Sequence, residues 1–428
     1  MQEFCDFCTF YLHICKKSCI FARYFEIIIN KQTKNYNIIR KLFTFFLALV
    51  TVAAVAEDLS SVKIGDLYYD LNTESSTATV VAKPSGKYTG DITIPSSVEY
   101  NSETFSVTAI VNAFYECADL TSVTLPNSVR NISDNSFYGC SSLESIVAND
   151  KIFARLPMSY SGSYTIPEGI QTIAGNAFQK CANLESVTIP KSVTSMGNRP
   201  FSTCYSLTAI EVAAGNTVYV AVKGVLFSKD KKMLVAFPGG KTGSYNVPSG
   251  VEVIGNAAFI TSNLETVNLP NSVQTLEEHA FFSCYKLTRV NIPNGVTSIG
   301  IYAFAYSNKL PEIVLGSELK TIGNYAFYSC SALKSITCKA VDPPTCPDEY
   351  VFRGTDKNAC LYVPQESISS YRKATGWSAL KDNTYPMAEA IGHVTNNATS
   401  ASRKLIRNGQ ILIERNGKLY NVAGAVVE

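Results

Sequence analysis

A motif with a period of 23 residues constrains this chain more than any other feature. Residues 120–143 read LTSVTLPNSVRNISDNSFYGCSSL, and the same order of apolar, proline, phenylalanine and cysteine positions then begins again. The phenylalanine recurs at intervals of 23 residues at Phe281, Phe304 and Phe327, and elsewhere two longer gaps mark inserted stretches of about 18 and 35 residues. Such a repeat predicts a stack of small units.

Each unit begins with apolar residues two apart that end at a proline, as in Val187, Ile189 and Pro190. This alternation predicts a very short strand with one buried face. A second apolar pair follows, for example Val296 and Ile299, and then a turn and the phenylalanine. One unit buries too little apolar surface to offset the entropy of ordering its backbone, whereas stacked units share their buried faces. We therefore expect a solenoid whose strands form parallel ladders along its length.

The order Ile-Pro-x-x-Val-x-x-Ile-Gly-x-x-Ala-Phe-x-x-Cys-x-x-Leu resembles the BspA-like leucine-rich repeat of bacterial cell-surface and secreted proteins, over roughly residues 62–380. The resemblance implies a mainly β solenoid with short helical turns. It also implies a role in adhesion to host proteins or other cells. This sequence departs from the pattern at Ser262 and Ser307, which replace cysteine, and at Leu315-Gly316, which replaces the apolar-proline pair.

The N-terminal segment has the order of a secretory signal peptide over residues 38–56. Arg40 and Lys41 precede an apolar run, and Ala54-Val55-Ala56 predicts cleavage after Ala56. The run is too short for a membrane span, so no transmembrane segment is expected in the mature chain. Residues 1–37 are then a misassigned start or a long leader that the mature protein lacks. A less favoured alternative is a zinc cluster of Cys5, Cys8, Cys15 and Cys19.

The remaining organisation follows from where the period holds. We predict an N-terminal cap over residues 57–110 and a repeat array over residues 111–340, with insertions near residues 149–164 and 213–245. A closing unit over residues 341–385, a linker over residues 386–402 and a C-terminal β tail over residues 403–428 follow. Alternation within the insertions resembles an added hairpin, which either shapes a binding edge or is a tolerated elongation.

The closing unit and the tail carry their own signals. Leu361–Pro364 predicts an edge strand, Ser367–Trp377 predicts a short helix with a serine cap, and the only tryptophan, Trp377, is expected to cap the core. Two Asn-Gly pairs predict a meander of three or four strands in the tail. The tail resembles C-terminal sorting segments of some Gram-negative bacteria; a small sheet without a targeting role is the alternative.

Few residues of the sequence indicate catalysis, metal binding or nucleic-acid binding. The whole chain has 37 Lys and Arg against 35 Asp and Glu, without a basic cluster, which argues against nucleic-acid binding. The only histidines, His13, His279 and His393, lie in the leader, at a variable repeat position and in the linker, so no triad or His-based metal site is assembled from them. No catalytic residue, cofactor or metal is therefore predicted. The cysteine column is interpreted as buried packing thiols and consists of Cys117, Cys140, Cys181, Cys204, Cys284 and Cys330.

Polar residues interleave with the buried residues of the predicted strands. Because strand side chains alternate, we expect them to face outward on one continuous face and to be the candidate partner-binding residues. They are Ser122, Thr124, Ser186, Thr188, Thr266, Asn268, Arg289, Asn291, Ser335 and Thr337.

An extended polar face suits a protein or glycan macromolecule on host or neighbouring cells better than a small molecule. The leading hypothesis is a non-catalytic interaction protein that is secreted or held on the outer cell surface. The alternatives are a glycan-processing enzyme or accessory that uses the repeats as a platform, and a structural component of a surface layer.

Overall fold

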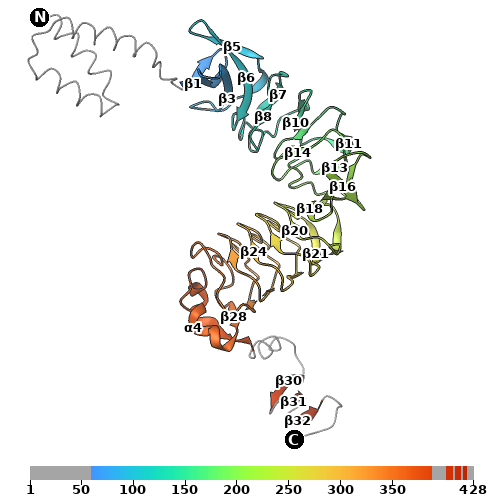
Figure 1. The fold of residues 1–428 in the computed structure, drawn as a ribbon, viewed down its shortest axis with the longest axis vertical. Coiled ribbons are helices and arrows are strands. Elements are labelled where there is room, and N and C mark those ends of the chain that lie inside the picture. The colour runs from blue at the N-terminus through green and yellow to red at the C-terminus, as the bar shows by residue number, and fades with distance from the viewer. Residues whose placement is uncertain (1–58, 388–401, 408–409, 416–417, 422–428) are drawn as a thin grey trace, which may run out of the picture. The chain divides into compact units, whose positions relative to one another are not determined.

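A computed structural model describes residues 59–387, 402–407, 410–415 and 418–421. By contacts the chain divides into two units, Met1–Glu57 and Asp58–Glu428. The predicted leader, signal peptide and N-terminal cysteine cluster lie outside the described residues, as does most of the linker. Figure 1 follows the described chain from the blue N-terminal strands to the orange closing unit.

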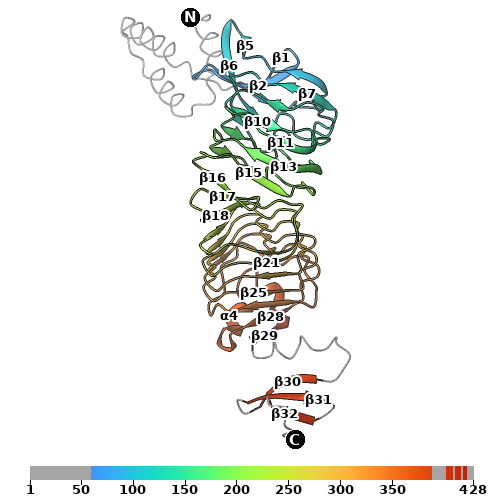
Figure 2. The same cartoon turned by 90° about the vertical axis from the view of Figure 1, so that its right-hand side faces the viewer.

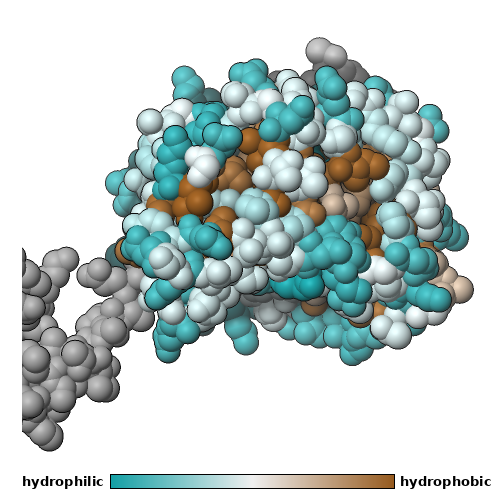
Figure 3. Space-filling view, turned by 90° about the horizontal axis from the view of Figure 1, so that it is seen from above, coloured by the Kyte–Doolittle hydropathy of each residue, from teal (hydrophilic) through white to brown (hydrophobic). Residues whose placement is uncertain are grey.

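The described chain begins with a mixed sheet in the order β1-β2-β3-β6-β5. Its strands are β1 (Leu59–Ile64), β2 (Leu67–Asn72), β3 (Thr77–Val81), β5 (Ser97–Tyr100) and β6 (Glu103–Val111). The alternating burial of β2 places Leu67, Tyr69 and Leu71 in the core, and β6 pairs in parallel with β8 (Asn131–Ile132), the first short strand of the array. Seen from above, the molecule shows hydrophobic residues gathered among hydrophilic ones (Figure 3).

The apolar-proline strands form a first ladder, which is parallel as predicted but divided into four sheets. Figure 2 looks onto several of these strands, drawn one below another. The sheets consist of β4 (Gly90–Thr93) and β7 (Leu120–Thr124); β11 (Ser161–Thr165), β13 (Asn183–Ile189) and β15 (Ala209–Val212); β19 (Thr242–Asn246), β21 (Asn263–Asn268) and β23 (Arg289–Asn291); and β25 (Glu312–Leu315), β27 (Ser335–Cys338), β28 (Cys360–Val363) and β29 (Thr384–Pro386).

One interruption of the first ladder has a simple cause. In a regular turn the N–H of Thr288 donates to the Glu265 carbonyl oxygen at 2.9 Å. The equivalent residue of the next turn is Pro311, which has no N–H, and β23 and β25 belong to different sheets. The ladder therefore stops where a proline removes the donor.

The second apolar pair of each unit forms a second ladder of short parallel strands. One sheet has the order β14-β12-β10-β9, and the other contains β16-β17-β18-β20-β22-β24-β26. The strands are β9 (Val147–Ala148), β10 (Ile152–Arg155), β12 (Thr172–Ile173), β14 (Ser195–Met196), β16 (Tyr219–Val222), β17 (Val225–Ser228), β18 (Met233–Ala236), β20 (Val253–Ile254), β22 (Thr275–Leu276), β24 (Ser298–Ile299) and β26 (Thr321–Ile322).

Both insertions contain antiparallel strands, which confirms the predicted hairpins. In the first insertion β9 pairs with β10, and in the second β16, β17 and β18 form a meander. Asn149 and Asn216 open the two insertions in the same way: each donates its side-chain amide to two carbonyl oxygens of the preceding turn and accepts two N–H groups of its own hairpin. The last strand of each insertion, β11 or β19, rejoins the first ladder.

A third ladder carries the phenylalanine and has no β conformation. The N–H groups of His279, Phe281 and Ser283 donate to carbonyl oxygens of the next turn at 2.9, 2.6 and 2.8 Å. The residues on both sides of the phenylalanine are left-handed, with φ of +57° at His279 and +55° at Ser283. A left-handed L-residue costs about 1 to 2 kcal/mol, which the three inter-turn hydrogen bonds offset.

A column of stacked phenylalanine rings fills the core between the ladders. Phe304 lies between Phe281 and Phe327 with centroid distances of 4.9 and 5.3 Å and nearly parallel planes. Phe153 and Phe237 come from the two insertions: Phe153 stacks on Phe178 at 5.0 Å, and Phe237 contacts Phe259 at 5.1 Å with its ring tilted by 31°. The insertions therefore continue the core and the ladders even though they lack the complete motif.

Tight contact between turns also explains the glycine of the motif. A Cβ atom at Gly300 would lie 2.5 Å from the backbone carbon of Glu277 in the preceding turn. Such an approach is shorter than any side chain tolerates, so only glycine fits there without displacing the neighbouring turn.

The closing unit differs from its prediction in two respects. The strand predicted for Leu361–Pro364 is present as β28, but it is not an edge strand, because β29 pairs with its other side. The predicted helix over Ser367–Trp377 is wrong in length: η1 (Gln365–Ser367) and α4 (Ile368–Tyr371) are followed by a turn at Gly376 and by η2 (Ser378–Asn383). Ser367 occupies the N-cap position without a side-chain capping bond.

Trp377 has the role predicted for it. Its indole is fully buried and lies 5.1 Å from the ring of Phe352, at the end of the phenylalanine column. Its Nε1–H donates to the Pro344 carbonyl oxygen at 2.9 Å. The tail forms a three-stranded antiparallel meander, as expected, from β30 (Ser402–Arg407), β31 (Gln410–Arg415) and β32 (Lys418–Asn421).

Candidate functional site

The polar residues predicted for the partner-binding face all lie on first-ladder strands, and none of them is buried. They belong to four sheets and not to one hydrogen-bonded ladder. Within each sheet the strand register brings them together: Thr266 lies opposite Arg289 and Asn268 opposite Asn291, while Ser335 and Thr337 share β27. The four groups are consequently separate patches of one kind of surface.

Some of these side chains are occupied by bonds along the ladder. Ser122 donates to Asp91 at 2.6 Å, Ser186 to Ser163 at 2.7 Å, and Asn268 to Asn246 at 2.7 Å. Asn291 both donates to the carbonyl oxygen of Leu269 and accepts its N–H. Among the described residues, six of the predicted face make no side-chain hydrogen bond and remain open to a partner: Thr124, Thr188, Thr266, Arg289, Ser335 and Thr337.

Sequence reasoning missed the strands that end the two insertions. Ser163 and Thr165 pair with Ser186 and Thr188, and Ser244 and Asn246 extend the columns of Thr266 and Asn268. The signal was present as Gly-Ser-Tyr-x followed by an apolar residue and proline, in Gly162–Pro167 and Gly243–Pro248. These strands widen two of the outward patches.

The cysteine column is buried, as predicted, and has a more specific role than packing. The thiols of Cys140, Cys204, Cys284 and Cys330 donate to the carbonyl oxygen of the phenylalanine in the preceding turn, at 2.9 to 3.1 Å. Ser307 makes the same bond to Phe281 at 2.9 Å. Serine therefore replaces cysteine because the position needs a small hydrogen-bond donor.

Burial also controls the chemistry of these thiols. Loss of solvent raises the pKa of Cys140, Cys284 and Cys330 to about 12 and that of Cys181 to about 11. The thiolate is the reactive and metal-binding form, so these groups are poor nucleophiles and ligands at neutral pH. Within the described residues, no group of three or more His, Cys, Asp and Glu side chains is placed to hold a metal ion.

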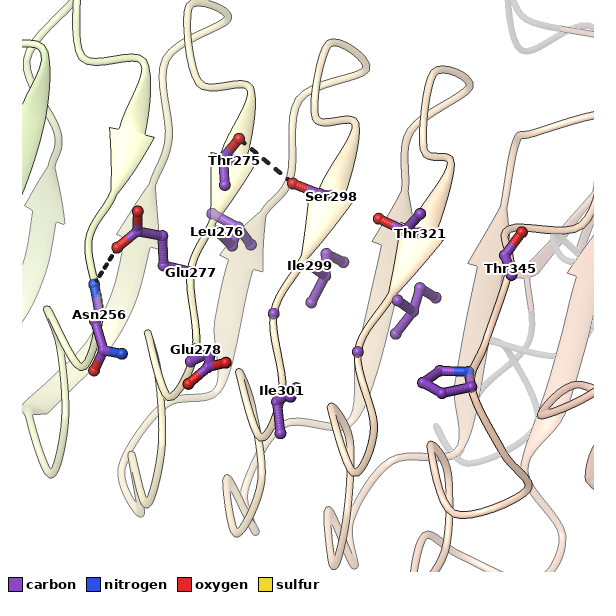
Figure 4. Close-up of a pocket in the computed structure, with 14 residues that line it drawn as sticks. Asn256, Thr275, Leu276, Glu277, Glu278, Ser298, Ile299, Ile301, Thr321 and Thr345 are labelled. Atoms are coloured by element: carbon purple, nitrogen blue, oxygen red, sulfur yellow. Dashed lines mark hydrogen bonds between the residues drawn. The ribbon is translucent and has the colours of Figure 1, made fainter. Parts of the chain in front are cut away.

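A second surface feature is an open groove of about 630 Å³ along the second ladder, over β22, β24 and β26. Figure 4 shows Thr275, Ser298, Thr321 and Thr345 in a row, one for each turn. Leu276 and Ile299 turn toward the core, and the backbone then passes through Gly300 and Gly323. Glu278 and Ile301 form the opposite side of the groove, which we name the hydroxyl groove.

The hydroxyl groove ends at a carboxylate. Glu277 stands where the following turns have Gly300 and Gly323, and its Oε2 accepts the N–H of Asn256 at 2.8 Å. Thr275 and Ser298 are in hydrogen-bond contact at 3.4 Å, whereas Thr321 is exposed. Of the described residues that line the groove, none is Lys or Arg.

The residues that follow Glu278 and Ile301 in the sequence belong to a column of stacked aromatic rings. His279, Tyr302, Tyr325 and Tyr350 stack with centroid distances of 5.4, 4.8 and 5.4 Å. Burial lowers the pKa of His279 to about 4, and the nearby Arg199 adds to the effect. The imidazole is therefore neutral at pH 7. Because the rings stack on one another from turn to turn, the column stabilises the left-handed turns.

Comparisons with known proteins agree with this architecture. The model of the BspA type leucine rich repeat region matches in six copies, over residues 149–222 and 235–358. The repeats of these two segments are similar to that family. Among curated proteins, none matches the sequence. In the described part of the chain, no helix has the length and apolar character needed to cross a bilayer.

Several solved structures are similar to this chain, and the first one given below supports the same fold. A leucine-rich repeat protein from Eubacterium ventriosum is 23% identical with a TM-score of 0.51, over 69% of this chain and 82% of that one. The pneumococcal vaccine antigen PcpA is 21% identical with a TM-score of 0.46, over 76% and 96% of the two chains. A leucine rich cell surface protein from Faecalibacterium prausnitzii is 22% identical with a TM-score of 0.45, over 75% and 99%.

Proposed function

We propose that this chain, whose residues 149–222 and 235–358 are similar to BspA-type leucine-rich repeats, is an adhesin-like interaction protein without catalytic activity. Its partner is a protein or glycan macromolecule on host or neighbouring cells. The observation that carries the proposal is the set of outward first-ladder side chains with no bond to the ladder. These side chains form flat patches spread over many turns, a geometry suited to a large partner.

The patch on β21 and β23 is the best candidate for the main contact. Arg289 is exposed and lies opposite Thr266 in the strand register, with Asn268 and Asn291 beside them. An arginine beside hydroxyl and amide groups combines a permanent charge with five donors, and arginine is enriched at binding hot spots. No comparable cation stands among the other predicted face residues.

We further propose that the chain reaches the outer surface or the medium through residues 38–56, with cleavage near Ala56. The support is the order of basic, apolar and small residues in the sequence. N-terminal sequencing of the secreted protein tests this directly. A mature chain that begins at Glu57 agrees with the proposal, and recovery of peptides from residues 1–37 contradicts it.

A screen of the full chain tests the interaction function. Immobilised mucin, extracellular matrix proteins and polysaccharides are tested for binding, and a panel of generic hydrolase substrates is tested for turnover in parallel. Saturable binding without turnover is expected. Turnover by the intact chain would reject the proposal in favour of an enzyme, and self-assembly without any ligand would favour a structural surface layer.

A further inference from the structure

We infer that the hydroxyl groove binds a neutral, linear oligosaccharide laid along the array. The inference concerns a different surface from the first-ladder patches and does not depend on the proposed function. It rests on the groove's repeated chemistry, its lack of cations and the position of its strands inside a sheet.

The groove presents the same arrangement once per turn. Each of three successive turns offers a hydroxyl group, at Thr275, Ser298 and Thr321, above buried aliphatic side chains. Thr345 continues the row through a bridge to Thr321. Neighbouring parallel strands lie about 4.8 Å apart, so the row extends over about 14 Å. A ligand that meets identical groups at equal intervals must itself repeat, as a polysaccharide of one sugar does and a peptide of varied sequence does not.

Two glycines line the groove. Gly300 and Gly323 follow Ser298-Ile299 and Thr321-Ile322 in the sequence, while Ile301 and Glu278 form the opposite side. Both glycine positions are bare backbone, and a Cβ atom there would collide with the preceding turn. The result is a trough with hydroxyl groups on one side and the half-exposed Ile301 on the other. A sugar ring has the same division into hydroxyl-bearing edges and apolar C–H surfaces.

The strands of the trough lie inside a sheet and the N–H groups of its glycines are already used, which disfavours an extended peptide. The N–H of Gly300 donates to the Leu276 carbonyl oxygen at 2.8 Å, and that of Gly323 donates to Ile299 at 2.7 Å. A peptide strand gains much of its affinity from main-chain bonds to a free sheet edge. Because β22 and β24 already pair with a strand on each side, the groove offers no free sheet edge, and the hydroxyl groups supply the repeated polar contacts.

The charge of the residues that line the groove favours neutral glycans over anionic ones. The groove has no lysine or arginine among its described lining residues and ends at Glu277 and Glu278. A sulfated or uronic-acid chain would place its anions beside these carboxylates without a compensating cation, which is unfavourable. The occupant is therefore an uncharged chain that extends over the span of a few turns.

Titration calorimetry on the full chain tests the inference with cellotetraose, mannotetraose and chitotetraose, beside a heparin tetrasaccharide as the anionic comparison. We expect at least one neutral tetrasaccharide to bind and to bind more tightly than its disaccharide, because the groove covers several turns. Binding of the heparin fragment alone, binding without dependence on chain length, or no binding of any neutral probe would overturn the inference.

Two variants locate the site. Thr321→Arg fills the trough from an exposed position and is expected to weaken binding at least tenfold, whereas the matched Thr194→Arg, at an exposed position outside the groove, leaves it unchanged. Ser298→Ala combined with Thr321→Val removes two hydroxyl groups without adding volume and is expected to weaken binding several-fold. Thermal melts of each variant confirm folding. Unchanged affinity in both groove variants would show that the sugar binds elsewhere.

Discussion

The thiol of Cys284 offers a sharp test of how the turns are joined. The side chain is 2% exposed and donates to the Phe259 carbonyl oxygen at 3.0 Å. That oxygen also accepts the N–H of Ser262 at 3.0 Å, so it keeps one partner when the thiol is removed. Loss of the donor should then cost about 0.5 to 1 kcal/mol, at the low end for a hydrogen bond. Loss of the sulfur leaves a small void that costs about 1 kcal/mol more.

Three substitutions separate the donor from the volume. Cys284→Ala is expected to destabilise the protein by about 1.5 to 2 kcal/mol because it removes both. Cys284→Val restores volume but not the donor, and Cys284→Ser restores the donor, as Ser307 does naturally at the equivalent place. We expect serine to be the mildest substitution, within about 1 kcal/mol of the parent.

Urea unfolding of the full chain, followed by circular dichroism, measures the order of these effects. Ser307→Cys serves as the matched control in the opposite direction and is expected to be nearly neutral, whereas Ser307→Ala should resemble Cys284→Ala. If Cys284→Val proves harmless and Cys284→Ser proves as damaging as alanine, the column is a packing column and the hydrogen-bond argument is wrong.

Three further substitutions probe the core and the aromatic column. Phe304→Ala should cost about 3 to 5 kcal/mol in urea unfolding because the ring is fully buried between two others; a loss below about 1 kcal/mol would contradict this, and the exposed Thr194→Ala is the control. Arg155 is fully buried and donates to the carbonyl oxygens of Asn176 and Gln179, so Arg155→Lys, which cannot span both, should lower the thermal midpoint by several degrees. The folded protein holds the pKa of His279 near 4, below the usual 6.5, so its stabilising effect is present above pH 6.5 and lost as the pH falls toward 4. After allowance for solvent screening this amounts to about 1 to 2 kcal/mol, and His279→Gln should flatten that part of the stability profile.

The period of the sequence was enough to predict the strands, their parallel stacking and the buried column, because each depends on apolar spacing alone. The third ladder was not predictable in this way. Its left-handed positions hold Tyr302, Ser283 and Thr203, residue types that give no sign of positive φ. Their conformation is imposed by hydrogen bonds to the next turn, which no single repeat contains.

The details of the candidate site could not be predicted from the sequence, for related reasons. The division of the first ladder at Pro311 depends on a missing donor in one turn, and the strand of Ser163 and Thr165 was hidden inside an apparent insertion. Arg155 supplies donors where the first insertion lacks the regular turn, but its burial is visible only in the folded chain. Spacing predicts which face a residue occupies, whereas its bonding partners depend on neighbouring turns.

Binding through the patch around Arg289 is the central claim about function, and one comparison tests it most directly. Surface plasmon resonance measures the full chain, the double variant Thr266→Glu with Arg289→Glu, and the exposed control Thr194→Glu against the macromolecule identified by the screen. We predict that the double variant loses at least tenfold in affinity while the control binds like the parent. Equal binding by all three proteins would contradict the account and remove the patch around Arg289 as the contact surface.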